Sequence, residues 1–534
     1  MNIQLRKLGA VLIVAVLTAA GCGGSSGGGD SVSPPPPTTP PPPTTPPPPP
    51  SGGIIRSGVA VGAGPITGFG SIIVNGSTYD TTSTTWIRDG DDSFSQSDFK
   101  VGETVIVKGS IDDNDNVVAE TVELDEIVKG LATAAAGNTA TVMGQTVRSD
   151  AGTLIDDDCN TLTTDVSFDD LSDLTAFFAV EVYGNVQPAD GSIKATFIEC
   201  KTEADLAGDE FEVNGIATSV TATTFNINGL QVNYSATPLI QNFPNGQISE
   251  NDPVEVKGAP GDFDPVQNVL AASKVEYKGN RFDGSEGDHY EIEGFISDFR
   301  AIDDFDVRIG LDTFTVITDP DTTTFEGDET LLGDNAKVEV EGEIDSENRL
   351  FATKVEIKTS TNIRVTGVVD PSANGEIRIL NILINTDDTT RFDDKRDDDP
   401  NFDASSIMAD DYIEARGQEA PPGQITAFEV RRDDLDTDLD NTELRGFTDP
   451  DSVVTESGAD GYRESFQVLG VTIDMSGPGI VYRDPNELPI DANEFWSVIE
   501  IEAAGGNAYL VDIKGEEQPD GTTLKATEVE LEME

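Results

Sequence analysis

Histidine is almost absent from this sequence, because His289 is the single one among 534 residues. The sequence therefore lacks the histidines needed for Ser–His–Asp triads, His-based zinc sites and most general-base mechanisms. Basic residues are scarce as well, since 33 Lys and Arg stand against 99 Asp and Glu and leave a net charge of −66. Nucleic acid would be repelled, and a basic patch for anionic lipid has little to form from, so we expect neither contact.

Beyond the N-terminus, no segment reaches the roughly 18 apolar residues needed to cross a bilayer. At the N-terminus, Arg6 and Lys7 precede an apolar stretch from Leu8 to Ala20. That order is typical of a secretory signal peptide, here residues 1–21. The small residues before Cys22 resemble the lipobox of bacterial lipoproteins, and on that resemblance Cys22 becomes the lipidated first residue of the mature protein. Ordinary cleavage with a free Cys22 is the alternative.

The lipobox resemblance also implies a location. Gly23 follows the cysteine, where Asp would imply the inner membrane, so we expect attachment to the outer membrane, facing the periplasm or the cell surface. Residues 22–55 form a linker rich in Gly and Ser and then, from Pro34 to Pro50, in Pro and Thr. The Pro/Thr part predicts a polyproline II spacer of roughly 50 Å, and a ligand for a proline-binding domain is the alternative.

One motif recurs six times along the rest of the chain. A Val-x-Val-x-Gly strand, with Ile or Ala replacing a Val in the last two copies, is followed after 9 to 13 residues by Ala-x-x-Val/Ile. The glycines that close this strand are Gly109, Gly184, Gly258, Gly342, Gly417 and Gly515. Such repetition predicts an array of small domains. Because the motif positions serve core and turns, we expect any localised function to lie where the repeats differ.

The repeats share one predicted order of strands. Each opens with a Gly-x-Ile/Val element such as Gly64–Ile66, continues with an alternating segment such as Ile72–Gly76, and reaches a Thr/aromatic cluster such as Thr390–Phe392. A polar stretch with room for one helical turn precedes the Val-x-Val-x-Gly hairpin. This is the order of a five-stranded OB-type Greek-key barrel, so we predict an all-β fold. A sandwich of six or seven short strands per repeat stays open.

The repeats divide the chain into six predicted barrels. Their boundaries are residues 56–126, 127–208, 209–280, 288–360, 361–433 and 434–534. Because the linkers between them hold only a few residues, neighbouring barrels should touch and form a semi-rigid rod.

Three segments of the first repeat, Gly68–Gly76, Val101–Gly109 and Ala119–Glu123, resemble an exported bacterial family catalogued as domain of unknown function 5666. The resemblance covers essentially everything after the Pro-rich stretch. It is weakest in the second and sixth repeats, which carry extra residues around 156–176 and 496–506. The resemblance implies a lipoprotein of tandem small β-domains, and it brings no catalytic residues.

Two cysteines remain after lipidation, Cys159 and Cys200, and both fall in the second repeat. Export permits a disulfide between them, which would close a loop of about 40 residues and contribute roughly 3–4 kcal/mol in the chain-entropy model. Two buried thiols are the alternative. A catalytic thiol is not expected, because no histidine accompanies either cysteine.

Carboxylates alternate in the linker before the last repeat. This alternation suits calcium, because one turn of backbone then aims hard oxygen ligands inward. Leu439 stands where an EF-hand needs glycine, so the run predicts only a low-affinity surface calcium site, and we expect no other cofactor. Its ligands would be Asp434, Asp436, Asp438 and Asp440. Lesser candidates are Asp112, Asp113 and Asp115, and Asp393, Asp394 and Asp397 to Asp399.

The two tryptophans differ in their setting. Trp86 lies where the third strand ends in other repeats, which favours a core position. Trp496 lies in the insertion peculiar to the last repeat, and we predict that it forms an exposed platform for binding, such as the stacking of a sugar.

Together these patterns favour a non-enzymatic, lipid-anchored envelope protein, an acidic rod of β-repeats acting as a structural or binding module. Its expected partners are the membrane, through the lipid, and envelope polysaccharides, proteins or cations. A calcium-stiffened spacer differs only in its dependence on the ion. The alternative from another class is an exported glycan-active hydrolase, although 99 acidic residues make any one pair of carboxylates uninformative.

Overall fold

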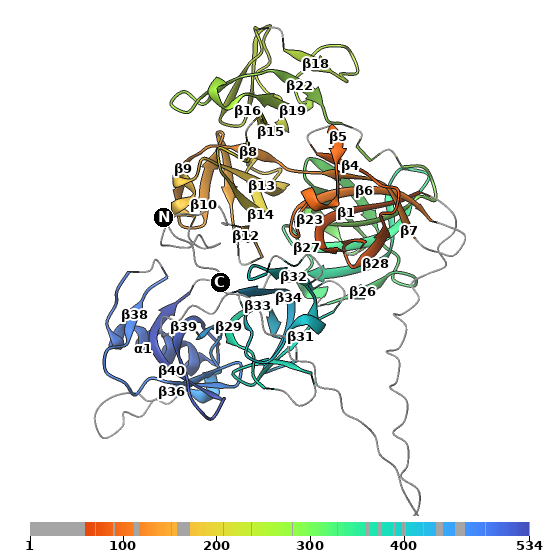
Figure 1. The fold of residues 1–534 in the computed structure, drawn as a ribbon. Coiled ribbons are helices and arrows are strands. Elements are labelled where there is room, and N and C mark those ends of the chain that lie inside the picture. Colours follow the sequence, from red (N-terminus) through yellow and green to blue (C-terminus); the bar gives the residue numbers. More distant parts are fainter. Residues whose placement is uncertain are drawn as a thin grey trace, which may run out of the picture. The chain divides into compact units, whose positions relative to one another are not determined.

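Strands dominate the computed structural model of this chain, and α1 (Ala492–Gly505) is the only α-helix in the described ranges (Figure 1). The structure describes residues 59–532 except 70, 89–90, 112–116, 151, 157–170, 207, 237, 280, 283, 328, 359–362, 372–374, 388–389, 398, 400–401, 420, 434–441, 454–464 and 486–487. Across these ranges, no helix combines the length and apolar character that a membrane crossing requires.

The strands fall into six units that follow the predicted repeats. The first contains β1 (Val59–Phe69), β2 (Ile72–Val74), β3 (Ser77–Asp80), β4 (Thr85–Arg88), β5 (Asp91–Phe94), β6 (Thr104–Ile111) and β7 (Val117–Leu124). The second contains β8 (Val128–Gly130), β9 (Ala132–Ala136), β10 (Thr139–Val142), β11 (Gln145–Arg148), β12 (Leu154–Asp156), β13 (Ala179–Val186) and β14 (Ile193–Lys201). The third contains β15 (Phe211–Ile216), β16 (Thr224–Ile227), β17 (Leu230–Asn233), β18 (Leu239–Gln241), β19 (Pro253–Gly258), β20 (Phe263–Asp264), β21 (Val269–Ala271) and β22 (Lys274–Tyr277).

The later units have the same plan. The fourth contains β23 (His289–Ala301), β24 (Asp304–Ile309), β25 (Asp312–Ile317), β26 (Thr324–Glu326), β27 (Lys337–Ile344) and β28 (Leu350–Lys358). The fifth contains β29 (Ile363–Val368), β30 (Ile377–Ile379), β31 (Ile382–Asn385), β32 (Arg391–Asp394), β33 (Tyr412–Glu419) and β34 (Gln424–Asp433). The sixth contains β35 (Thr442–Phe447), β36 (Ser465–Val468), β37 (Val471–Asp474), β38 (Val481–Arg483), α1, β39 (Leu510–Glu517) and β40 (Thr523–Leu531).

The fourth unit shows how the strands close on themselves. β23 pairs antiparallel with β24, and β24 with β25. β25 runs parallel to β28, β28 antiparallel to β27, and β27 antiparallel to β23 again. The first unit repeats this circuit with β1, β2, β3, β7 and β6. A closed circuit with this order is the OB-type barrel that the sequence predicted, and it excludes a sandwich for these two units.

The glycine of the recurring motif lies at an irregularity in the last hairpin. The register of β6 and β7 shifts between Lys108 and Gly109. A Cβ atom on Gly109 would lie 2.2 Å from the carbonyl oxygen of Val118, so no other residue fits without displacing the backbone. Gly342 has the same relation to Phe351, again at 2.2 Å. The motif glycine therefore permits a β-bulge that bends the hairpin into the barrel wall.

The barrels meet edge to edge through the strand that opens each of them. β8 pairs antiparallel with β15, β29 antiparallel with β35, and β1 parallel with β23. These contacts cover strand edges whose backbone groups would otherwise be unpaired. The third contact joins the first barrel to the fourth, which is not its neighbour in sequence. The short linkers predicted contacts between sequence neighbours, and this contact is an additional one that they did not predict.

The sixth barrel departs from the prediction of one helical turn. Most other barrels have a 3₁₀ turn in that place, such as Gln96–Asp98, but the sixth has the 14-residue helix α1. Asp491 caps it by accepting hydrogen bonds from the backbone of Asn493 and Glu494, and Gly506 ends it with φ 78°.

The two tryptophans both belong to the core. Trp86 is 6% exposed and packs on Phe99 with ring centroids 5.0 Å apart, which confirms the prediction for it. Trp496 is 3% exposed because α1 turns it toward the barrel, where it packs against Phe466 and Phe495. The prediction of Trp496 as an exposed binding platform is wrong.

Candidate functional site

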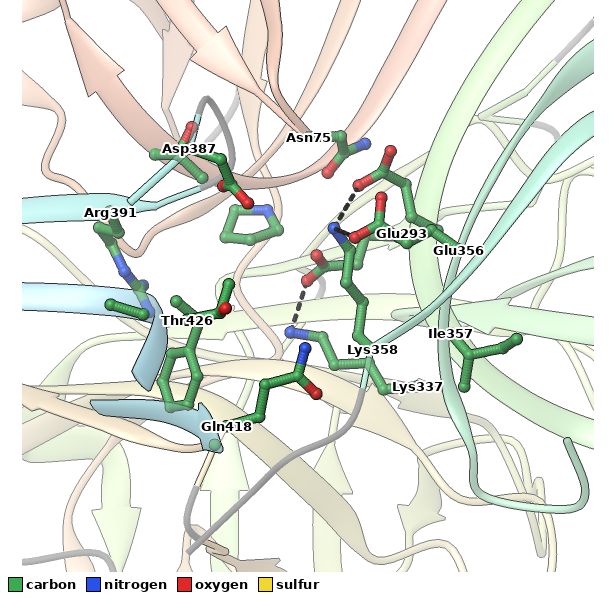
Figure 2. A pocket seen from close by; sticks show the side chains of 16 residues that line it. Asn75, Glu293, Lys337, Glu356, Ile357, Lys358, Asp387, Arg391, Gln418 and Thr426 are labelled. Carbon is green, nitrogen blue, oxygen red and sulfur yellow. Dashed lines mark hydrogen bonds and ion pairs between the residues drawn. The ribbon is translucent and has the colours of Figure 1, made fainter. Parts of the chain in front are cut away.

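A cavity of about 140 Å³ is lined by residues of the first, fourth and fifth barrels together with Gly152 of the second (Figure 2). Asn75 comes from the turn after β2, Glu293 from β23 and Gln418 from β33. No single barrel supplies the lining, so the cavity exists only when these barrels are assembled.

The fourth barrel contributes a row of glutamates that crosses three adjacent strands. Glu293, Glu339 and Glu356 are direct partners in the register of β23, β27 and β28. Like charges placed this way repel one another, and two lysines offset the repulsion. Lys337 Nζ lies 2.7 Å from Glu293 Oε1, and Lys358 Nζ lies 2.7 Å from Glu356 Oε1 and 3.0 Å from Glu339 Oε2.

Burial and ion pairing move the pKa values of these glutamates in opposite directions. Burial, together with the charges of Glu356 and Glu293, raises the pKa of Glu339 to about 7, although Lys358 opposes the shift. Burial would raise the pKa of Glu293 too, but Lys337 and Lys358 outweigh it and the pKa is lowered. At neutral pH the cavity wall thus holds a carboxyl group near its titration midpoint beside one that is ionised.

Arg391 lines the cavity from the fifth barrel, on the side opposite Lys337 and Lys358 (Figure 2). The residue is 8% exposed, and its guanidinium makes no hydrogen bond or ion pair among the described residues; its Nε is enclosed without a partner. Burial lowers the pKa of Arg391, against the attraction of Glu429 and Glu293.

Another buried arginine of the same barrel is paired with a carboxylate, as buried arginines usually are. Arg432, on β34, donates to both carboxylate oxygens of Asp394. The sequence placed Arg391 in a Thr/aromatic cluster and gave it no role. The equivalent positions of the first and fourth repeats hold Thr85 and Thr324, so an arginine in place of a threonine was the available signal.

A wider groove of about 1290 Å³ among the first three barrels is lined by buried ion pairs. Arg88 of the first barrel donates to both oxygens of Glu181 in the second. Lys201 Nζ lies 2.7 Å from Glu181 Oε2 and 2.6 Å from Glu199 Oε2, and Lys100 Nζ lies 2.8 Å from Glu199 Oε1. These pairs link the first and second barrels through charge.

Two glutamates of the groove also have pKa values that are shifted in opposite directions. Burial alone would raise the pKa of Glu181, but Lys201, Arg88 and Lys129 outweigh it and lower the pKa to about 2. Burial raises the pKa of Glu103 to about 8, with Arg88 opposing the shift and Glu199 and Glu181 supporting it.

Thermal stability should therefore fall as the pH rises from about 5 to about 8. The folded-state pKa values of Glu103 and Glu339, about 8 and about 7, exceed the ordinary glutamate value of 4.5, so the folded protein binds more protons in this window than the unfolded chain. Their contribution is complete below pH 4.5 and is lost as the pH rises through these values, while Glu181, with a pKa of about 2, stays ionised throughout. We expect a melting temperature roughly 5 °C or more lower at pH 8 than at pH 5, measured by scanning calorimetry.

The substitution Glu103→Gln supplies the control for this pH dependence. It removes one of the groups that titrate in this range and should flatten part of the profile. A melting temperature of the unaltered protein that stays constant or rises over the same range would contradict the assignment.

Comparison with known proteins identifies the repeats. Residues 63–123, 129–199, 206–276, 293–356 and 364–431 each match the family model described as domain of unknown function (DUF5666), and together they cover more than half of the chain. The chain belongs to the DUF5666 family. No curated protein matches it. A solved structure named drosophila Unr CSD456 aligns at 12% identity over 44% of this chain and 97% of that chain, with a TM-score of 0.12, which supports no argument.

Most residues that the sequence singled out in this DUF5666 protein lie outside the described ranges. They are Cys22, Cys159, Asp434, Asp436, Asp438, Asp440, Asp112, Asp113, Asp115 and Asp398. Cys200 is described; it is 6% exposed, lines the groove and is disulfide-bonded. Its pairing with Cys159 stays a prediction.

Three of the remaining DUF5666 candidates contact basic side chains. Asp394 and Asp397 accept hydrogen bonds from Arg432, and Asp393 lies 3.6 Å from Lys395. Within the described residues, no group of three or more His, Cys, Asp or Glu side chains is arranged to hold a metal ion. Asp398 of this acidic turn lies outside those residues, so the calcium prediction for the turn stays a prediction. The single histidine, His289, lies 3.7 Å from Glu341, and burial lowers its pKa.

Proposed function

We propose that this DUF5666 protein is a non-enzymatic, lipid-anchored protein of the bacterial envelope, attached to the outer membrane through Cys22. Its barrels act as a structural or binding module for envelope polymers, proteins or cations. The observation that carries the proposal is the cavity that three separate barrels build together, with charged side chains facing it. One small barrel could not form such a site, so the site offers a reason for the repetition of the barrels.

The charges around the cavity support binding over proton transfer. Lys337 and Lys358 each lie within 2.7 Å of a glutamate, so their positions are fixed by the protein. Fixed and compensated charges recognise a ligand by complementarity at little cost of reorganisation. The acidic surface, with a net charge of −66, keeps the anchored barrels solvated and favours neutral polymers or cations elsewhere on the molecule.

One observation favours the hydrolase alternative. Glu339 and Glu293 line the same cavity with pKa values shifted in opposite directions, and such a division is used by glycosidases for acid and nucleophile. Burial argues against the hydrolase alternative, because Glu339 is 4% exposed and Lys358 forms an ion pair with its carboxylate. A proton donor must reach the glycosidic oxygen, and this one is covered.

A single experiment tests both functions. The full chain and its Cys22→Ser variant are expressed in a bacterial host, the membranes are separated by density, and outer-membrane fractions are incubated with envelope polysaccharide. We expect the unaltered chain in the outer membrane, Cys22→Ser in the soluble fraction, and capture of polysaccharide without release of reducing ends. Equal distribution of the two forms would overturn the anchor, and release of reducing ends abolished by Glu339→Gln would establish the hydrolase.

A further inference from the structure

We propose that the cavity of Figure 2 binds a small, singly charged carboxylate that also carries hydroxyl groups, such as a uronic acid unit, and that Arg391 holds its carboxylate. This inference rests on the proposed function and names the ligand class for one site of the module.

The unpaired guanidinium is the primary evidence. A buried charge costs several kcal/mol unless a partner compensates it, and this chain has three acidic residues for each basic one. Other enclosed arginines use that excess: Arg88 contacts Glu181, and Arg281 contacts Asp125 and Asp312. Arg391, 8% exposed, makes no such contact among the described residues although carboxylates are abundant. An anionic ligand that completes its hydrogen bonds explains why the position holds arginine.

The other walls narrow the choice of anion. The planar fork of a guanidinium matches a carboxylate or a phosphate equally well. Glu293, Glu339 and Glu356 also face the cavity, and they repel a phosphate dianion about twice as strongly as a monoanion. The same carboxylates accept hydrogen bonds, which ligand hydroxyl groups can donate.

Size and shape agree with a single sugar acid. The cavity of about 140 Å³ is below the range of drug-sized pockets, so it suits one ring rather than an oligomer. Pro65 and Phe428 add apolar surface to the lining, which can cover the C–H face of a sugar ring. Arg391 lies across the cavity from Glu293 and Glu356, so a ligand with an acid at one end and hydroxyl groups at the other is oriented by both sides (Figure 2).

The test is calorimetric titration of the full chain in detergent with sodium D-glucuronate at neutral pH, with D-glucose and inorganic phosphate in parallel. We expect saturable binding of glucuronate and at least about tenfold weaker binding of both other probes, since one charge-assisted bidentate contact is at stake. Arg391→Gln should abolish the glucuronate signal, and Arg391→Lys should restore part of it. Arg378→Gln is the matched control, because this arginine of the same barrel pairs with Glu376 outside the cavity and should leave binding unchanged.

Melting temperatures separate a binding defect from a folding defect. Arg391→Gln should raise the melting temperature, because it removes a buried charge without a partner. Thr67→Phe fills the cavity from the first barrel and leaves the arginine in the chain, and it should block glucuronate as well. Absence of glucuronate binding to the unaltered chain, equal binding by Arg391→Gln, or tighter binding of phosphate or glucose would each overturn the proposal. Polysaccharide capture that persists without glucuronate binding would overturn this site and leave the module intact.

Discussion

Replacing Trp496 with alanine should lower the free energy of unfolding of the sixth barrel by about 3–5 kcal/mol. The ring is 3% exposed and makes edge-on contacts with Phe466 at 5.8 Å and with Phe495 at 5.9 Å between centroids. Alanine would leave a cavity between α1 and the barrel that neither neighbour can fill without leaving its own contacts. The expected loss is a large share of the stability of a small domain.

Limited proteolysis of the full chain followed by mass spectrometry measures this effect locally. We expect faster cleavage within residues 442–531 of Trp496→Ala and unchanged cleavage elsewhere. Ile501→Ala is the matched control, because Ile501 lies on the same helix and is 66% exposed; its effect should stay within about 0.5 kcal/mol. Equal cleavage of Trp496→Ala and the unaltered chain would show that the ring does not support the barrel.

The sequence contains signals for the helix that buries Trp496, but a comparison of the repeats does not reveal them. Asp491 precedes it, Glu494 follows three residues later, Gly506 ends it, and Phe495, Trp496 and Ile499 share its buried face. The segment is missing from the other repeats, so it was interpreted as an insertion with an exposed ring. Local helix signals were the better guide, because capping and periodicity act within one turn and need no counterpart elsewhere.

The barrels themselves were predictable because their causes are local. Alternating valines place one face of each strand in the core, and the motif glycine permits the bulge in the last hairpin. The contact between β1 and β23 was not predictable, since the register of Ala60 with His289 joins strands that are far apart in the sequence. Nothing in either strand alone specifies which other edge will cover it.

The motif also holds more than core positions. Its outward-facing position, between the two apolar residues, is a carboxylate in most repeats, and several of these carboxylates are buried where barrels meet. They are Glu181, Glu255, Glu339 and Asp512. Function was expected only where the repeats differ, yet Glu339 lines the cavity from this shared position. Arg391 is the departure from the shared pattern that gives that cavity an unpaired positive charge.

Replacing Glu181 with glutamine should destabilise the pairing of the first two barrels by about 3–5 kcal/mol, the usual cost of breaking a buried ion pair from one side. Glu181 is fully buried between Arg88 of the first barrel and Lys201 of the second. Glutamine keeps the shape and one hydrogen bond but removes the charge that both cations face. Lys201 retains Glu199 at 2.6 Å, whereas Arg88 retains Glu103 only at 3.7 Å, so most of the loss falls on Arg88.

Chemical denaturation of the full chain measures the loss, and Arg148→Gln is its control. Arg148 forms an exposed pair with Asp190 in the same barrel, with both side chains more than half exposed, so its removal should cost no more than about 0.5 kcal/mol.

The pKa of Glu103 gives an independent readout. Burial raises it to about 8 with support from the charge of Glu181, and Arg88 opposes the shift. Glu181→Gln removes the negative charge that supports the shift, and Arg88 then has Glu103 as its remaining carboxylate partner. The pKa of Glu103 should therefore fall, and stability should depend less on pH between about 5 and 8. An unchanged pH profile together with unchanged stability would mean that this network does not join the barrels.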